Sequence, residues 1–289
     1  MSSSKGWIIA AVIVVLVVLG LIKIFHKPAP VVLPVEKPVS SEPKHEIIGA
    51  SVQNRNIEAY TYGTGSTTLL FVGGMHGGYE WNSVLLAYDF MDYLQANPDF
   101  IPKNLTISVI PDANPDGVFA VIGKEGRFTL SDVPTKKSAI AGLGRFNANN
   151  VDLNRNFDCN WQATSTWQNK KVSAGTAAFS EPETQAIRDF ILKVQPSAAV
   201  FWHSQSDAVY ASECNGGILP KTLDIMNAYA KAAGYPAVKS FDAYPITGDS
   251  EGWLASINIP AITVELKTHE TVEWPQNFAG IKALINLFN

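Results

Sequence analysis

Hydrophobic and polar positions divide most of the chain into short apolar runs and longer amphipathic stretches. Four apolar runs predict buried strands: TLLFVGG (68–74), LTISVI (105–110), AAVFW (198–202) and AITVEL (261–266). Four stretches with helical spacing predict helices over residues 80–96, 181–194, 220–233 and 275–288. This alternation of strands and helices indicates an α/β architecture, with four buried strands as a minimum.

The second of these helices has a defined start in the sequence. Ser180 precedes it, Pro182 falls in its first turn, and Glu183 stands three residues after Ser180. This spacing is typical of a capping box, and proline is favoured in the first turn of a helix. We therefore expect the helix to begin at Ser180.

The N-terminal part of the chain has a different pattern. Residues 6–22, GWIIAAVIVVLVVLGLI, carry no charge, and a helix of this length just crosses a hydrocarbon core of about 30 Å. The alternative is a cleaved signal peptide, but His26, Lys27 and Pro28 follow the run where a small-residue cleavage site would stand. An uncleaved membrane anchor is therefore favoured.

Between the apolar run and the first predicted strand, proline is frequent. Five prolines fall between residues 27 and 46, which favours an extended stalk without a core of its own. The sequence thus predicts a membrane anchor over residues 1–26, a Pro-rich stalk over residues 27–46 and a single domain over residues 47–289.

Composition limits the functions that this domain can have. The 289-residue chain is 46% hydrophobic and 17% charged, so it can bury a large core and is not intrinsically disordered. Its formal net charge is −4, from 22 Lys+Arg against 26 Asp+Glu. Because binding to phosphates requires a basic surface, and the sequence contains no basic stripe, we expect no nucleic-acid partner.

Two histidines stand where α/β sheets place ligand sites. His76 follows the strand predicted over 68–74, and His203 closes the strand over 198–202. Glu80 lies four residues after His76, with two glycines between them. Two imidazoles and one carboxylate suit a catalytic zinc ion. On spacing alone, two satisfied core histidines explain the pattern equally well.

The order of several motifs adds to this picture. The succession GGMHGGYEWN, PDANPDG, VDLNRNFD, FSEPE, FWHS and ITVEL, which spans residues 71–266, resembles the zinc carboxypeptidases of the carboxypeptidase A type, an M14-like peptidase family. The resemblance implies an α/β fold with a mixed, mainly parallel eight-stranded sheet flanked by helices. It also implies one Zn²⁺ per chain, held by His76, Glu80 and His203. One departure is that the family usually spaces these first two ligands as H-x-x-E, whereas HGGYE is H-x-x-x-E.

The resemblance also implies the catalytic residues. Glu265, in TVEL, matches the family's general base, which takes a proton from water and later delivers it to the departing amine. Read alone, Glu265 could instead form a strand-end ion pair with Lys267. Arg145 matches an arginine that stabilises the oxyanion. Arg127 is the rival for this role, and either arginine could be an ordinary surface residue.

Substrate-binding residues follow from the same resemblance. Asn154 and Arg155 match the pair that holds the terminal carboxylate, a group that a guanidinium binds through two parallel hydrogen bonds. Tyr244 matches a mobile tyrosine that closes over the substrate. Glu251, seven residues later, matches the pocket for the terminal side chain, where an acid would favour basic or diamino residues. Its alternative is a solvated loop glutamate.

These assignments predict a membrane-tethered zinc metallocarboxypeptidase that hydrolyses the C-terminal peptide bond of peptides with a free C-terminal carboxylate. The alternatives are an N-acyl amino acid deacylase or amidase on the same scaffold, and a catalytically inactive cell-surface binding module. Cys159 and Cys214 could form a disulfide or remain separate thiols. A disulfide would favour an extracytoplasmic catalytic domain beside the membrane.

Overall fold

A computed structural model describes residue 7, residues 42–135 and residues 142–289. Ser41–Asn289 form one compact unit. The predicted membrane anchor, apart from Trp7, and most of the predicted stalk lie outside the described residues. Within the described ranges, no helix combines the length and the apolar character that crossing a membrane requires.

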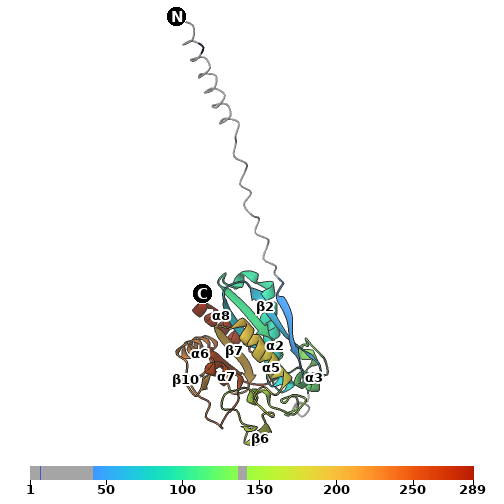
Figure 1. The fold of residues 1–289 in the computed structure, drawn as a ribbon. Coiled ribbons are helices and arrows are strands. Elements are labelled where there is room, and N and C mark those ends of the chain that lie inside the picture. The colour runs from blue at the N-terminus through green and yellow to red at the C-terminus, as the bar shows by residue number, and fades with distance from the viewer. Residues whose placement is uncertain (1–6, 8–41, 136–141) are drawn as a thin grey trace. The chain divides into compact units, whose positions relative to one another are not determined.

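An eight-stranded sheet runs through the compact unit (Figure 1). In sheet order its strands are β1 (Lys44–Ala50), β2 (Asn56–Gly63), β4 (Leu105–Ile110), β3 (Thr67–Val72), β7 (Ala198–Ser204), β12 (Ala261–Leu266), β8 (Ala208–Ala211) and β11 (Ala237–Val238). Four of the seven strand pairings in the described part are parallel, including β4–β3, β3–β7 and β7–β12. The predicted mixed, mainly parallel eight-stranded sheet is confirmed.

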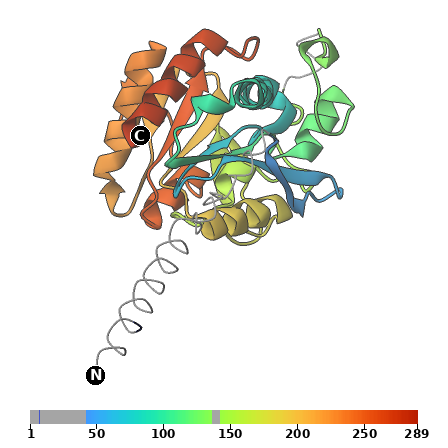
Figure 2. The same cartoon turned by 90° about the horizontal axis from the view of Figure 1, so that it is seen from above.

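Helices cover both faces of the sheet (Figure 2). One face carries α2 (Trp81–Ala96), α6 (Pro220–Ala233) and α8 (Trp274–Phe288), and the other carries α5 (Pro182–Val194) and α7 (Ser250–Ser256). Alternate residues of each central strand supply the two cores: Phe71 and Trp202 belong to the first, and Leu70 and Phe201 to the second. Strands buried on both faces read as continuous apolar runs, which is why the four predicted strands could be found.

Shorter elements complete the fold. Two small two-stranded sheets pair β5 (Thr164–Trp167) with β6 (Lys170–Ser173), and β9 (Glu213–Cys214) with β10 (Gly217–Ile218). Helix α3 spans Pro115–Ile122. The 3₁₀ turns are η1 (Gly77–Glu80), η2 (Pro98–Phe100), η3 (Leu130–Asp132) and η4 (Leu153–Arg155). All four predicted helices are present, within one residue of their expected ends.

The predicted capping box at Ser180 is wrong. Helix α5 begins at Pro182, and the Ser180 hydroxyl instead accepts a hydrogen bond from Nδ2 of Asn156 (3.0 Å). The Glu183 carboxylate accepts one from Nδ2 of Asn147 (3.1 Å) rather than reaching back to the helix start. Both side chains have tertiary partners, and these partners replace the local cap.

The folded part begins slightly before the predicted boundary. Lys44, His45 and Glu46, which the sequence places in the stalk, belong to β1 and pair with β2. The His45 ring stacks on Tyr60 of β2, with 4.7 Å between the ring centroids. Pairing with a neighbouring strand thus extends the domain over the end of the Pro-rich segment.

Candidate active site

Three neighbouring parallel strands end at one cavity of about 420 Å³. His76 follows β3, His203 lies near the end of β7, and Glu265 lies near the end of β12. His203 and Glu265 are paired residues in the β7–β12 register. The carboxyl edge of the sheet therefore brings these three side chains to the same cavity, as the sequence predicted.

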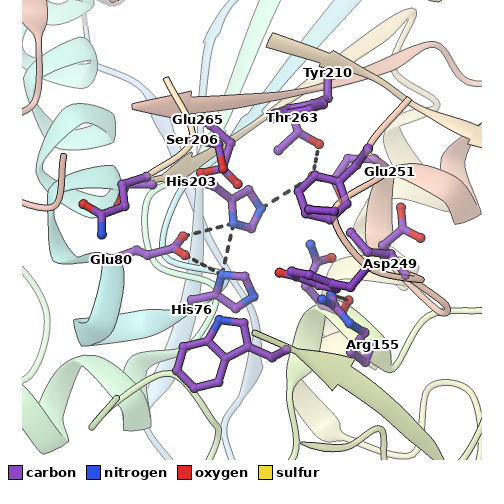
Figure 3. A pocket seen from close by; sticks show the side chains of 18 of the residues that line it. His76, Glu80, Arg155, His203, Ser206, Tyr210, Asp249, Glu251, Thr263 and Glu265 are labelled. Atoms are coloured by element: carbon purple, nitrogen blue, oxygen red, sulfur yellow. Dashed lines mark hydrogen bonds and ion pairs between the residues drawn. The ribbon is translucent and has the colours of Figure 1, made fainter. Parts of the chain in front are cut away.

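The ligand atoms of His76, Glu80 and His203 converge in this cavity (Figure 3). The two Nδ1 atoms are 3.1 Å apart, and they lie 2.8 Å (His76) and 3.0 Å (His203) from the two carboxylate oxygens of Glu80. A tetrahedral zinc ion with bonds of about 2.0–2.1 Å holds neighbouring ligand atoms about 3.3 Å apart. The residues present therefore fit a zinc ion in both chemistry and spacing.

The turn HGGYE explains how an H-x-x-x-E spacing can serve this site. Gly77–Glu80 form the 3₁₀ turn η1, in which Gly77 has a φ of 47°. Residues with such a left-handed φ are usually glycine. The turn brings the Glu80 carboxylate back beside the His76 ring, so the additional residue does not separate the two ligands.

A junction of three glycines joins this turn to two other segments. A Cβ atom on Gly77 would lie 2.6 Å from the carbonyl oxygen of Gly144, and one on Gly117 would lie 2.3 Å from the same oxygen. Gly117 belongs to α3 in the motif PDANPDG, and Gly144 directly precedes Arg145. The three backbones therefore pack without intervening side chains, which fixes the metal-binding turn relative to Arg145.

Two buried carboxylates lie behind the histidines. Oδ1 of Asp152 is 3.4 Å from Nε2 of His76, and Oε1 of Glu251 is 3.5 Å from Nε2 of His203. Carboxylates at the outer nitrogen commonly orient metal-binding imidazoles. The sequence reasoning did not single out Asp152, although its place two residues before Asn154 in VDLNRNFD offered a signal.

Burial and neighbouring charges shift the pKa values of the cavity's carboxyl groups in opposite directions. Burial raises the pKa of Glu265 to about 7, and the nearby Glu80 charge adds to this effect. Burial also acts to raise the pKa of Glu80, but the charges of His76 and His203 outweigh it and hold this pKa well below its usual range. For Glu251, contact with His203 overcomes burial and lowers the pKa to about 2.

The two candidate arginines occupy different places. Arg145 is 3% exposed and lines the cavity, where its Nε and Nη2 donate hydrogen bonds to Oδ2 of Asp152 (3.0 and 2.8 Å). Its remaining nitrogen, Nη1, is 3.8 Å from Oε1 of Glu80. Arg127 pairs with Asp92 and is absent from the described lining of this cavity. Of these two arginines, only Arg145 lies near the His76–Glu80–His203 cluster.

The predicted carboxylate-binding residues, Asn154 and Arg155, also line the cavity. In Figure 3, Glu80 lies on one side of the two imidazoles, and Arg155 and Glu251 lie on the other. Oδ1 of Asn154 accepts hydrogen bonds from the backbone and hydroxyl of Ser250 (2.9 Å each), which turns the donor end of this amide away from Ser250. Tyr244 is half-buried and also lines the cavity. The structure thus brings all nine predicted site residues to one place.

Glu251 is not a solvated loop residue. It lies in α7 and is 2% exposed, and its carboxylate accepts hydrogen bonds from the hydroxyls of Ser250 and Thr263 (2.8 Å each). Asp249 caps the same helix by accepting a hydrogen bond from the backbone of Gly252 (2.7 Å). The side of the cavity on which Figure 3 shows Arg155 therefore also carries two acids.

Cys159 and Cys214 form a disulfide, which excludes the alternative of two separate thiols. The bridge joins the segment that follows Arg155 to β9. Further residues that the sequence did not assign to the site line the cavity, among them Tyr79, Trp167, Gln168 and Asp249.

Comparison with known proteins gives a family and several relatives of this chain. A family described as zinc carboxypeptidase matches residues 40–282. The chain is 26% identical over 239 residues to "Gamma-D-glutamyl-L-diamino acid endopeptidase 1" of Lysinibacillus sphaericus, covering 76% of this chain and 59% of that protein. It is 32% identical over 131 residues to "Murein peptide amidase A" of Escherichia coli strain K12, covering 42% of this chain and 50% of that protein.

A solved structure has the same fold. The murein-tripeptide amidase of Escherichia coli O157 superposes with a TM-score of 0.59 at 23% identity, covering 88% of this chain and 95% of that one. In the sequence comparison, by contrast, the chain spans between half and three fifths of the length of the two curated relatives.

Proposed function

The chain belongs to the zinc carboxypeptidase family, and on that premise we propose that it hydrolyses the last peptide bond of peptides that end in a free carboxylate. One observation carries the proposal: the His76–Glu80–His203 cluster, Glu265 and Arg155 line a single cavity. The family's zinc ion would be held by the three cluster residues. When bound, it would supply a Lewis acid that polarises water and the scissile carbonyl.

The chain's own residues would bind the substrate and move the protons. Arg155 and Asn154 would hold the terminal carboxylate through charge-assisted hydrogen bonds, and Tyr244 would close over it. The Glu265 carboxylate would take the proton of the attacking water and deliver it to the nitrogen of the departing amine. Nη1 of Arg145 would donate a hydrogen bond to the carbonyl oxygen as negative charge develops on it.

We further propose that the released residue carries a basic or diamino side chain. Glu251 and Asp249 place two acids at the end of the cavity that would receive this side chain. An ammonium or guanidinium group would compensate the negative charge of these two acids, whereas an apolar side chain would add no compensating charge. The name of one relative, an endopeptidase acting beside an L-diamino acid, agrees with this preference.

A second candidate is an amidase of the same reaction type. Two similar proteins bear the name murein peptide amidase or murein-tripeptide amidase. Such an enzyme would also release an amine that carries a carboxylate, and the same residues would perform the chemistry. The two candidates differ in the acyl side of the substrate, which a substrate panel can separate.

We propose a tether and a location on separate grounds. The uncharged run over residues 6–22 has the length of a membrane anchor, and the Cys159–Cys214 disulfide suits an oxidising compartment outside the cytoplasm. The full chain should therefore stay with the membrane fraction after a high-salt wash and be released by detergent. Release by salt alone would argue against the anchor.

The test of activity uses the full chain, purified in detergent without chelator. We expect about one zinc ion per chain by elemental analysis, and release of the last residue from peptides ending in Lys, Arg or diaminopimelate faster than from a peptide ending in Leu. Chelation should abolish release, and added zinc should restore it. The panel also contains a murein tripeptide and an N-acyl amino acid. Faster cleavage of the first would identify an amidase, and faster cleavage of the second would identify a deacylase. Folded, zinc-loaded protein that cleaves none of these would indicate a binding module.

A further inference from the structure

The β5–β6 hairpin contacts both arginines of the cavity. Cζ of Arg145 lies 4.4 Å from the ring centroid of Trp167, the last residue of β5. The preceding carbonyl, of Thr166, accepts a hydrogen bond from Nη2 of Arg155 (3.2 Å). Two adjacent hairpin residues thus touch the side chains that would bind the oxyanion and the terminal carboxylate.

The hairpin also holds the partner of Arg145. The backbone N–H of Asp152 donates a hydrogen bond to the carbonyl of Ser173, the last residue of β6 (2.9 Å). At the other end, Gln168 and Asn169 form the turn with φ values of 47° and 62°. Positive φ at both central residues is typical of a type I′ turn, whose twist matches that of a β-hairpin. The hairpin is therefore a defined element and not an irregular loop.

The Trp167 indole is held in its place beside Arg145. Its ring meets Tyr79 and Phe146 edge to face, with centroid distances of 5.3 and 6.0 Å. The Arg145 guanidinium has Asp152 along one edge, the Trp167 indole beside Cζ and the Tyr79 ring farther away, at 5.9 Å. Its remaining nitrogen, Nη1, faces the Glu80 side of the cavity.

We infer that Trp167 is a positioning residue for Arg145, which holds the guanidinium so that Nη1 faces the carbonyl oxygen of the substrate. This inference rests on the proposed function of Arg145. Asp152 holds one edge of the guanidinium. Of the two aromatic rings beside Cζ, the indole is the nearer, at 4.4 Å from the ring centroid against 5.9 Å for Tyr79. A cation over an aromatic face is attracted to it, so the indole adds a second constraint on the guanidinium. Its contribution is expected in turnover and not in substrate binding, because the oxyanion forms only during the reaction.

The kinetic test compares Trp167→Leu and Trp167→Phe in the zinc-loaded full chain, on the best peptide of the panel. A cation–π contact worth about 0.5–2 kcal/mol corresponds to about a 2- to 30-fold change. Trp167→Leu should lower kcat by a factor in this range and leave KM within about 2-fold. Trp167→Phe should recover most of the loss, because it restores an aromatic face.

Two further comparisons make the kinetic test specific. In an Arg145→Ala background, Trp167→Leu should have no additional effect on kcat. Trp161→Leu is the control, because the Trp161 indole donates to the carbonyl of Ala174 (2.9 Å) and is absent from the described cavity lining. An unchanged kcat in Trp167→Leu, or an equal loss with and without Arg145, would overturn the inference.

A spectroscopic measurement tests the contact between Trp167 and Arg145 independently of catalytic activity. The Nε–H signal of Arg145 in a ¹⁵N–¹H spectrum, assigned by its loss in Arg145→Lys, should be displaced by the indole ring current. Trp167→Leu should abolish this displacement, and Trp161→Leu should retain it. If the wild-type protein cleaves no peptide, the proposed function fails while this signal still tests the contact. A signal that does not move in Trp167→Leu would refute the positioning role even if peptides are cleaved.

Discussion

Oε1 of Glu251 lies 3.5 Å from Nε2 of His203, on the far side of the imidazole from the Nδ1 atom that meets Glu80. Asp152 stands in the same relation to His76. A carboxylate at Nε2 favours a proton there, which leaves the lone pair of Nδ1 directed toward the cluster. Glu251 therefore touches both the metal-binding group and the end of the cavity that would receive the terminal side chain.

Glu251→Gln and Glu251→Lys should separate these two contacts. The glutamine can still accept the hydrogen bond from Thr263 and keeps a polar oxygen beside His203. Zinc affinity should therefore change by less than about 3-fold, while the preference for a terminal Lys over Leu falls about 10-fold. The lysine places a cation behind His203 and should also weaken zinc binding by about 10- to 100-fold. Zinc titration and competition between the two peptides measure these effects. Asp99→Lys, an exposed site with the same charge change, is the control.

Glu265→Gln should abolish most turnover without loss of the fold. The amide has nearly the same size but cannot accept the proton of water, so kcat should fall by about 100-fold or more. Zinc content and the thermal midpoint should match those of the wild type. Turnover within 3-fold of the wild-type value would remove Glu265 from the role of general base.

Arg145→Ala and Arg127→Ala should differ sharply. Arg145 lies in the cavity beside Glu80, and loss of a donor to the oxyanion lowers kcat by about 100- to 1,000-fold. Arg127 pairs with Asp92 at the surface, so its removal should leave kcat within about 2-fold. Steady-state kinetics on one peptide give both values. The reverse ranking would reassign the oxyanion role.

Asp112 should make stability depend on pH. Burial raises the pKa of Asp112 to about 8 in the folded protein, against about 3.9 in an unfolded chain. The folded state thus binds the proton more tightly, and the free energy of unfolding should fall as pH rises from about 4 through 8. Thermal midpoints measured across this range should decline in the wild type.

Asp112→Asn should make that decline smaller, because the amide does not ionise. The variant can still accept the backbone hydrogen bond from Asn114 that Asp112 accepts (3.1 Å). At pH 9 it should be more stable than the wild type by about 1 kcal/mol or more, which corresponds to about 2–4 °C. If the thermal midpoints of the two proteins change in parallel with pH, Asp112 is not the cause of the decline in stability.

The central sheet and its two histidines could be predicted because their signals are local. The strands before His76 and at His203 are continuous apolar runs, and parallel strands end at a common edge. The capping of α5 could not be predicted, since Ser180 and Glu183 bind side chains from distant segments. Local capping rules do not include such partners.

The candidate site could be predicted only residue by residue, and not as a set of contacts. The choice between Arg145 and Arg127 needed the position of each relative to the sheet. The contact of Glu251 with His203 joins α7 to β7, and no spacing in the sequence encodes it. Trp167 stands on a short hairpin with a polar sequence, where neither periodicity nor a motif marks it.

The meeting of Gly77, Gly117 and Gly144 has a consequence for how such a site can change. A side chain at any of these positions would collide with the backbone of another segment. Replacing one glycine would therefore shift the metal-binding turn, α3 and the Arg145 segment together. In protein engineering, the three segments should therefore be transferred together to another scaffold, while the cavity-lining side chains can be exchanged one at a time.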